Sequence, residues 1–176
     1  MLPVLPLLLA CTDAPPAPPT REPRPNLLVV TLDTTRADRI GAYGGPAGAT
    51  PTLDRLAREG TVFTRAYTVT PLTIPAHATL HTGLLPPRHG VRDNGDHFLG
   101  PGFDTVAERL QGAGYATMAS VGAEVTSRHW GFDQGFDAYH DDMGVPRRDR
   151  NRWAIERPGR AVVDDALGWL DEQDGE

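Results

Sequence analysis

Short apolar blocks, separated by turns rich in glycine and proline, recur along most of the chain. The first block, Leu27–Val30, is a continuous apolar run that is typical of a strand buried on both faces, and we expect this strand to extend to Thr31. A second strand is predicted at 116–121. A weaker alternating pattern at 61–68 predicts another strand or extended segment there.

Helical patterns alternate with these strands. A threonine before a proline begins one predicted helix at Thr50–Pro51, and Gly60 ends it. Thr105 and Glu108 have the spacing of a capping box, which predicts a short helix after them. The last helix is predicted at 161–170, with an apolar face formed by Val163, Ala166, Leu167 and Leu170. This order predicts an α/β fold with a mixed, mostly parallel sheet and helices on both of its faces.

Three predicted strands make a thin sheet for this fold class, whose core needs helices over both faces. The chain also ends in an acidic stretch directly after its last predicted helix, where a βαβ series would normally continue with a strand. We therefore expect the folded part at 26–176 to be incomplete in this chain. A small complete domain with an acidic tail is the alternative.

The first 25 residues have a different composition from the rest. An apolar run at 1–10 is too short to span a bilayer and precedes the single cysteine of the chain, Cys11. The residues before Cys11 resemble a bacterial lipobox, so 1–11 is predicted to be a lipoprotein-type signal segment with lipidation at Cys11. The alternative is an apolar terminus without function. The proline-rich segment 12–25 is predicted to be an extended linker.

The predicted lipid anchor implies a location in the cell envelope, at the periplasmic or outer-membrane surface, with the membrane as one partner. The chain has 17 basic and 23 acidic residues, and its net charge of -6 argues against a nucleic-acid partner, which requires a basic stripe. The densest basic cluster is Arg147, Arg148, Arg150 and Arg152, which is typical of a solvated face. A small anionic substrate is compatible with this charge if a metal ion dominates the local field.

Two polar positions have the setting of a reactive site. Asp33 follows the predicted strand at 27–31, and ligands of open α/β sheets bind at the carboxyl ends of strands, although an aspartate here could equally cap a helical turn. Thr73 stands at or just before the start of a helix that Pro75 and Gly83 delimit. Backbone N–H groups and the positive end of the helix dipole gather at such a position and favour an anionic ester. Thr73 is therefore a candidate nucleophile, with an ordinary N-cap as the alternative.

Several ordered blocks resemble landmarks of the sulfatase family, and together they cover about 26–170. They are 26–38, 50–60, 75–83, 88–95, 105–110 with 114–117, and 131–137. The resemblance implies that 26–176 is the N-terminal part of a sulfatase-like catalytic domain with an alkaline-phosphatase-like α/β fold. It also implies covalent catalysis on a small anionic ester and a divalent metal, calcium in the first place, with zinc or manganese as alternatives.

The resemblance assigns roles to four residues of this chain. Asp33 matches the first metal-binding aspartate of the family, whereas Thr34 stands where many members have a second aspartate. Thr73 stands at the position of the family's catalytic cysteine or serine, and His77 at that of its signature arginine. Asp33, Thr34 and Thr73 are therefore the predicted metal ligands, and Thr73 and His77 are predicted catalytic residues. His89 is a further catalytic candidate, although residues of such a turn are commonly structural.

The threonine changes the chemistry that the resemblance implies. A threonine cannot become the formylglycine of classic sulfatases, so a covalent ester on Thr73 must be cleared by water or by another acceptor. We expect metal-dependent hydrolysis of sulfate esters through this intermediate. One alternative is a phosphodiesterase, phosphonate hydrolase or phosphoethanolamine-type transferase, and another is an inactive surface lipoprotein of the same fold. Further family ligands would lie beyond Glu176, so this chain alone is expected to be inactive.

Overall fold

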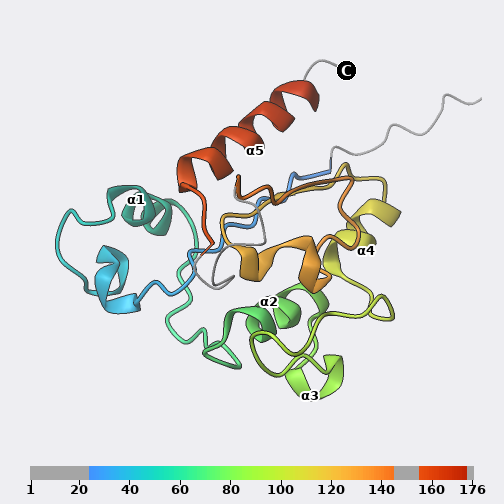
Figure 1. Cartoon of the computed structure of the whole chain (residues 1–176). Helices are drawn as coiled ribbons and strands as arrows, with labels where there is room; N and C mark the ends of the chain where they lie inside the picture. The colour runs from blue at the N-terminus through green and yellow to red at the C-terminus, as the bar shows by residue number, and fades with distance from the viewer. Residues whose placement is uncertain (1–23, 145–154, 174–176) are drawn as a thin grey trace, which may run out of the picture. The chain divides into compact units, whose positions relative to one another are not determined.

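The structure is a computed structural model that describes residues 24–144 and 155–173 (Figure 1). The predicted signal segment 1–11, the lipidation site Cys11, most of the linker 12–25 and the arginine cluster at 147–152 lie outside the described residues. The chain divides into two compact units, Met1–Thr34 and Thr35–Glu176, and each is described by itself.

The first unit does not contain the strand that the apolar run predicted. Residues 24–34 have no strand or helix. The four apolar side chains are between 59% and 81% exposed; they are Leu27, Leu28, Val29 and Val30. The prediction of a buried strand at 27–31 was therefore wrong, because such a strand needs neighbouring strands beside it and helices over its faces. The described residues of this unit contain no such element.

The second unit contains a small parallel sheet. Strand β1, Met118–Ser120, pairs in parallel with β2, Ala138–His140, in the register Met118↔Ala138. β1 confirms the strand predicted at 116–121 and is shorter, and the parallel pairing confirms the predicted sheet type. β2 was not predicted. Its three residues are too few to show a pattern.

The segment 61–68 does not form the predicted strand either, and the structure gives it turns and irregular backbone. Its apolar residues do not share one face, because Val62 and Phe63 are adjacent, and a strand would direct them to opposite sides. Phe63 is 71% exposed and Tyr67 is 84% exposed. Without a buried face or a paired neighbour, the segment gains nothing from a strand conformation.

Helices and short 3-10 turns make up most of the rest of this unit, and they confirm each predicted helix. The α-helices are α1, Pro51–Glu59; α2, Thr73–Thr82; α3, Pro86–His89; α4, Val106–Gly112; and α5, Gly159–Gln173. The 3-10 turns are η1, Ala37–Arg39; η2, Gly41–Tyr43; η3, Glu124–Thr126; and η4, Arg128–Trp130. None of the helices within 24–144 and 155–173 is long and apolar enough to cross a membrane.

Local capping signals explain where two helices begin. The capping box of α4 is present, because the Glu108 N–H donates to Thr105 Oγ1 at 3.1 Å and the Thr105 N–H donates to Glu108 Oε2 at 2.8 Å. Thr50 occupies the N-cap position of α1 as predicted. Its hydroxyl, however, accepts a hydrogen bond from the Gly41 N–H and donates one to Asp54, so it joins η2 to α1.

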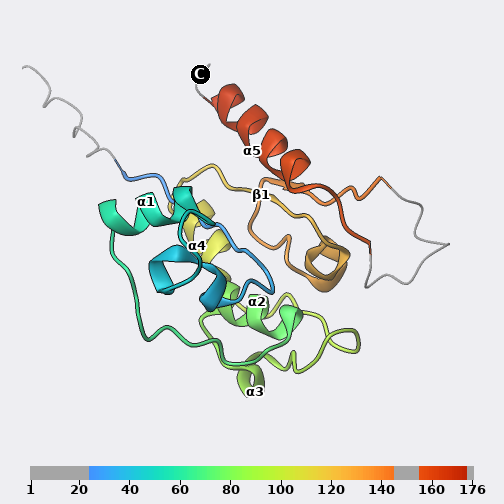
Figure 2. The same ribbon diagram turned by 90° about the vertical axis from the view of Figure 1, so that its left-hand side faces the viewer.

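Helix α5 packs against β1 (Figure 2). Val163 and Leu167 are each 54% exposed and Leu170 is 48% exposed, so three of the four residues of the predicted apolar face are exposed. The half-buried positions of the helix include Asp165 and Ala166. Asp165 accepts hydrogen bonds from the Ser120 hydroxyl at the end of β1 and from Arg157, and these contacts favour an orientation in which Asp165 faces the sheet.

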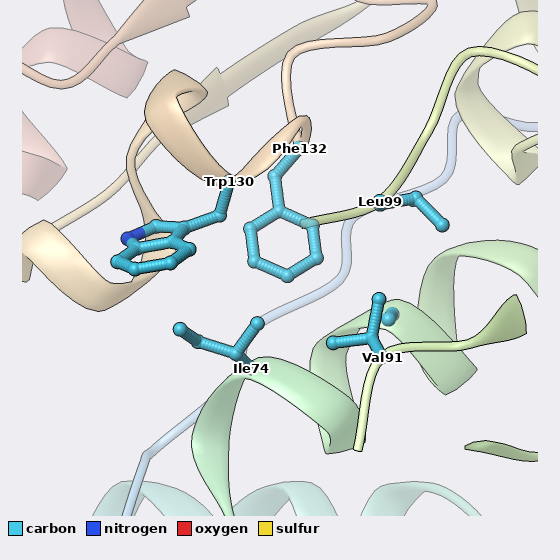
Figure 3. Close-up of a cluster of buried hydrophobic side chains, with 6 residues drawn as sticks. Ile74, Val91, Leu99, Trp130 and Phe132 are labelled. Atoms are coloured by element: carbon cyan, nitrogen blue, oxygen red, sulfur yellow. The ribbon is translucent and has the colours of Figure 1, made fainter. Parts of the chain in front are cut away.

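The core of the second unit lies between α2 and the connection from β1 to β2. Figure 3 shows Ile74 of α2 facing Trp130 and Phe132, with Val91 and Leu99 beside them. All five side chains are at most 2% exposed, and Ala78 of α2 completes the cluster. The connection itself consists of η3 and η4 where a βαβ unit usually has an α-helix. The start of α2 is therefore fixed by this core cluster.

Candidate active site

Helix α2 places Thr73 as its first residue, as the sequence predicted. Leu72 is the N-cap in an extended conformation, and Gly83 ends the helix with a φ of 68°, a value that favours glycine. Thr73 is half-buried. Leu72 has no polar side chain for capping, and Pro75 has no N–H group. The helix therefore depends on other parts of the chain to bond its first N–H groups.

One of these groups is bonded by Asn94, which the sequence did not single out. The Ile74 N–H donates to Asn94 Oδ1 at 2.9 Å. The sequence led us to expect the first N–H groups of α2 to face an anionic ester, but the Ile74 N–H is bonded to a side chain. The Asn94-Gly95 pair is a turn signal, and such a signal does not identify a partner 20 residues away.

His77 lies one helical turn after Thr73. Its Nδ1 atom is 2.9 Å from the Thr73 carbonyl oxygen. A carbonyl oxygen can only accept, so Nδ1 carries the hydrogen, and Nε2 is the basic nitrogen of the neutral ring. The hydrogen-bond partner thus assigns the tautomer. His77 is half-buried, and its ring centroid is 6.2 Å from that of Phe132.

A second histidine, His81, lies on the next turn of α2 and was not predicted from the sequence. Burial, with a smaller contribution from the charge of His77, lowers the pKa of His81 from 6.5 to about 4. Its ring packs 5.3 Å from Phe132 and 6.0 Å from Phe136, measured between ring centroids. Its Nδ1 atom is buried and has no hydrogen-bond partner among the described residues. His81 is therefore held neutral in an aromatic environment.

His89 fastens the turn after α2 to that helix. The Val91 N–H donates to His89 Nδ1 at 3.1 Å, so the ring hydrogen is on Nε2, which lies 3.0 Å from Thr79 Oγ1. The residue is 3% exposed, and burial lowers its pKa below 6.5. Both ring nitrogens are bonded within the fold, which gives His89 a structural role. Its predicted contact with substrate stays a prediction.

Asp33 and Thr34 belong to the first unit, whereas Thr73 belongs to the second. The Thr34 N–H donates to Asp33 Oδ1 at 2.9 Å, and both residues are exposed. Thr34 has a φ of 56°, a left-handed conformation that is uncommon for a β-branched residue. Such outliers are found most often at turns and functional sites.

The predicted metal was compared with the donor groups that the structure describes. No group of three or more histidine, cysteine, aspartate or glutamate side chains lies together within 24–144 and 155–173. A calcium ion needs six to eight oxygen ligands, and zinc usually needs at least three protein ligands. The described residues of each unit therefore do not form a metal site by themselves.

Comparison with known proteins identifies the family. The family described as Sulfatase matches residues 25–176. The chain is 36% identical to the steryl-sulfatase of Mus musculus over 175 residues, which is 89% of this chain and 27% of that protein. It is 34% identical to the N-acetylglucosamine-6-O-sulfatase of Bacteroides thetaiotaomicron, over 76% of this chain and 23% of that protein. The chain thus spans about a quarter of the length of these relatives.

A solved structure gives the same result. The structure of a 2-O GAG sulfatase matches with a TM-score of 0.53 and 26% sequence identity, over 68% of this chain and 27% of that chain. This neighbour confirms the predicted alkaline-phosphatase-like α/β fold. Members of the family generally use a divalent metal. The match over 25–176 and the identity to the two relatives lead to one conclusion: this chain belongs to the sulfatase family.

Proposed function

We propose that the protein hydrolyses sulfate esters with the hydroxyl group of Thr73 as nucleophile. The observation that carries this proposal is the position of Thr73 as the first residue of α2, in a chain of the sulfatase family. The positive end of the helix dipole favours negative charge at this position, and a sulfate ester carries such a charge. The two relatives are named for a steryl and a sugar sulfate, so the leaving group is not assigned.

The proposed reaction has two displacements at sulfur. Thr73 Oγ1 attacks the sulfur atom, the bond from sulfur to the ester oxygen breaks, and the alcohol leaves with the proton that Thr73 loses. Water then attacks the sulfur of the threonine sulfate, which releases sulfate and a proton and restores the hydroxyl group. We assign the first proton transfer to His77, because Nδ1 is bonded to the Thr73 carbonyl and Nε2 is the basic nitrogen.

A divalent metal stays part of the prediction but not of this reaction scheme. The predicted ligands in this chain are Asp33, Thr34 and Thr73. Since the described residues of each unit do not form a metal site by themselves, no step is assigned to a metal. We infer that the two exposed oxygen groups of Asp33 and Thr34 suit calcium better than zinc, because calcium prefers oxygen ligands.

Phosphate diesters are the second candidate substrates, and the observation that favours them is again the threonine. Sulfatases that use formylglycine release sulfate by reverting to an aldehyde, and threonine lacks that route. A threonine ester must be cleared by water or by another acceptor, and this requirement applies equally to a phosphoryl group. A phosphonate hydrolase or a transferase would use the same first step.

The test compares two substrates in the full-length protein and in its Thr73→Ala variant, because this chain alone is expected to be inactive. Aryl sulfate turnover with added calcium, zinc or manganese is expected to fall more than about a thousandfold in the variant, because the nucleophile is removed. Thr52→Ala, an exposed threonine in α1, is the matched control and should keep full activity. Turnover that persists in Thr73→Ala would refute the proposal. Turnover of bis-aryl phosphate alone would select the second candidate.

We also propose that the protein is attached to the cell envelope through a lipid on Cys11. The support is the sequence, an apolar run followed by the single cysteine and a proline-rich linker. In a bacterial host, Cys11→Ser should abolish incorporation of a labelled fatty acid and move the protein from the membrane fraction to the soluble fraction. Equal labelling of both proteins would contradict the anchor.

A further inference from the structure

We propose that Asn94 is a positioning residue for Thr73, because its side-chain oxygen holds the peptide unit that directly follows Thr73. This inference rests on the proposed function of Thr73. Asn94 does not lie on α2. It belongs to the loop at 92–98, which follows α3, and it reaches back to the first turn of α2.

The first turn of α2 needs this contact. Ile74 is 0% exposed, and a buried backbone N–H without a partner costs about 1–3 kcal/mol. Leu72, the N-cap residue, makes no side-chain hydrogen bond. The oxygen of Asn94 therefore provides the bond that an N-cap side chain normally makes, from a distant part of the sequence.

The loop that carries Asn94 is fixed at both ends. Val91, on one side, is 0% exposed, and Leu99, on the other side, is 1% exposed, and both belong to the same core cluster as Ile74. Gly95 has a φ of 121°, which allows the chain to turn directly after Asn94. The position of Asn94 is thus set by the core that also holds α2.

Within the loop, a carboxylate provides a further constraint. Asp93 Oδ1 accepts a hydrogen bond from the Asp96 N–H at 3.3 Å and lies 2.9 Å from His97 Nδ1. The hydrogen bond with His97 lowers the pKa of Asp93 below its ordinary value, so the carboxylate form is favoured. These contacts close the loop around Asn94.

The consequence concerns the direction of the Thr73 side chain. The peptide plane between Thr73 and Ile74 fixes ψ of Thr73, and the bond from the Ile74 N–H to Asn94 fixes that plane. Displacing a nucleophile by about 1 Å can cost about a hundredfold in rate. Without the bond, the first turn of α2 is expected to fray while the rest of the helix stays packed in the core.

The test measures amide hydrogen exchange and kinetics in two variants of the full-length protein. In Asn94→Ala, the Ile74 amide should exchange at least about tenfold faster, because its hydrogen bond is gone. In the same variant, kcat for the aryl sulfate should fall about ten- to a hundredfold with KM within about twofold. Asn94→Asp keeps an acceptor oxygen, and asparagine and aspartate are equally good caps, so it should restore both Ile74 protection and most of kcat.

Asp96→Ala is the matched control, because Asp96 is exposed in the same loop and contributes its backbone N–H. It should leave Ile74 exchange and kcat unchanged. Unchanged Ile74 exchange in Asn94→Ala would overturn the proposal, and so would unchanged kcat where Thr73→Ala is inactive. Turnover that survives Thr73→Ala would refute the proposed function and the positioning role with it. In that case the Ile74 exchange rate would still show whether Asn94 holds the Ile74 amide. Failure of the proposed function can therefore be distinguished from absence of this hydrogen bond.

Discussion

Helices α2 and α5 belong to the same unit but have opposite surroundings. α2 buries Ile74, Pro75 and Ala78. Side chains from the segments that follow α2 bond to its first turn and to its last turn. α5 has no fully buried residue, although it is five residues longer, and its apolar residues Val163 and Leu167 are exposed. Its side-chain hydrogen bonds to the sheet and its surroundings are made by Asp165.

The difference shows which helix can hold a reactive group in place. α2 has no aspartate, glutamate, lysine or arginine, so neighbours can cover most of its surface without burying a charge. α5 carries acidic and basic side chains that must stay in water or be paired. Rigid packing at α2 therefore fixes the backbone at Thr73, whereas α5 is attached mainly through a cluster of charges and has only half-buried apolar contacts.

The largest expected effect comes from the core beneath α2. Phe132 is 1% exposed and contacts both histidine rings of α2. Phe132→Ala should lower the free energy of unfolding by about 3–5 kcal/mol, because it leaves a cavity. Phe98→Ala, at a residue that is 65% exposed, should change it by less than about 0.5 kcal/mol. Chemical denaturation of both variants measures the difference. Equal losses of stability would contradict the view that packing beneath α2 stabilises the fold.

The second effect depends on pH and concerns His81. Its pKa in the folded state is about 4, below the value of 6.5, so the unfolded chain binds the proton first as pH falls. Stability from this group is therefore complete above about pH 6.5 and is lost as pH falls to about 4. The full loss is about 3 kcal/mol.

The measurement compares unfolding curves of the protein and of His81→Leu across this range. The variant should have a smaller decrease in stability between pH 6.5 and 4, because the titrating group is gone. If both proteins lose stability in parallel, His81 is not the group responsible.

A smaller effect is expected at the polar link of α5. Asp165 accepts hydrogen bonds from Arg157 and, at 3.0 Å, from the Ser120 hydroxyl. The bond with Arg157 is the main reason that the pKa of Asp165 is lowered, so its stabilisation is present above the ordinary pKa and is lost as pH falls below it. Asp165→Asn should cost about 1–2 kcal/mol at neutral pH.

The control is Asp164→Asn, at the adjacent residue. Its ion pair with Arg160 is solvent-exposed, with side chains 62% and 89% accessible, and should contribute less than about 0.5 kcal/mol. The difference between Asp165→Asn and the unchanged protein should shrink in acid, as measured by denaturation. A pH-independent difference would mean that packing, and not the charge, accounts for it.

The smallest effect tests the orientation of α5. Val163 is 54% exposed, whereas its neighbour Val162 is half-buried and its Cγ2 atom lies beside Gly122. Val163→Ser should change the free energy of unfolding by less than about 0.5 kcal/mol. Val162→Ser should cost about 1 kcal/mol, because it removes a methyl group that packs on the sheet end. A larger loss of stability in Val163→Ser than in Val162→Ser would mean that the apolar face predicted from the sequence is the face that packs.

The parts of the fold that the sequence predicted correctly depend on local chemistry. The capping box of Thr105 and Glu108, the proline at the start of α1 and Gly83 at the end of α2 each act within one helical turn. The strand at 27–31 and the apolar face of α5 were predicted from hydrophobicity alone. The strand does not form and most of the face is exposed, because burial depends on which neighbours are present and on polar contacts such as that of Asp165.

The candidate site likewise contains residues that local signals in the sequence predict and residues that they do not. The position of Thr73 at a helix start could be predicted, because Pro75 and Gly83 mark the helix in the sequence. Asn94, His81 and the structural bonds of His89 could not, because each depends on contacts between separate turns or loops. A single histidine or an Asn-Gly pair has several common structural roles, and the sequence does not choose among them.

The bond between Asn94 and the Ile74 N–H also has a consequence for the ageing of the protein. Asparagine is thermolabile, and a following glycine such as Gly95 exposes its side-chain carbonyl to attack by the next backbone nitrogen. Deamidation to aspartate would keep the acceptor oxygen, whereas isoaspartate would move it by one backbone atom and release the amide. A stored preparation would then become a mixture of two populations that differ in the first turn of α2.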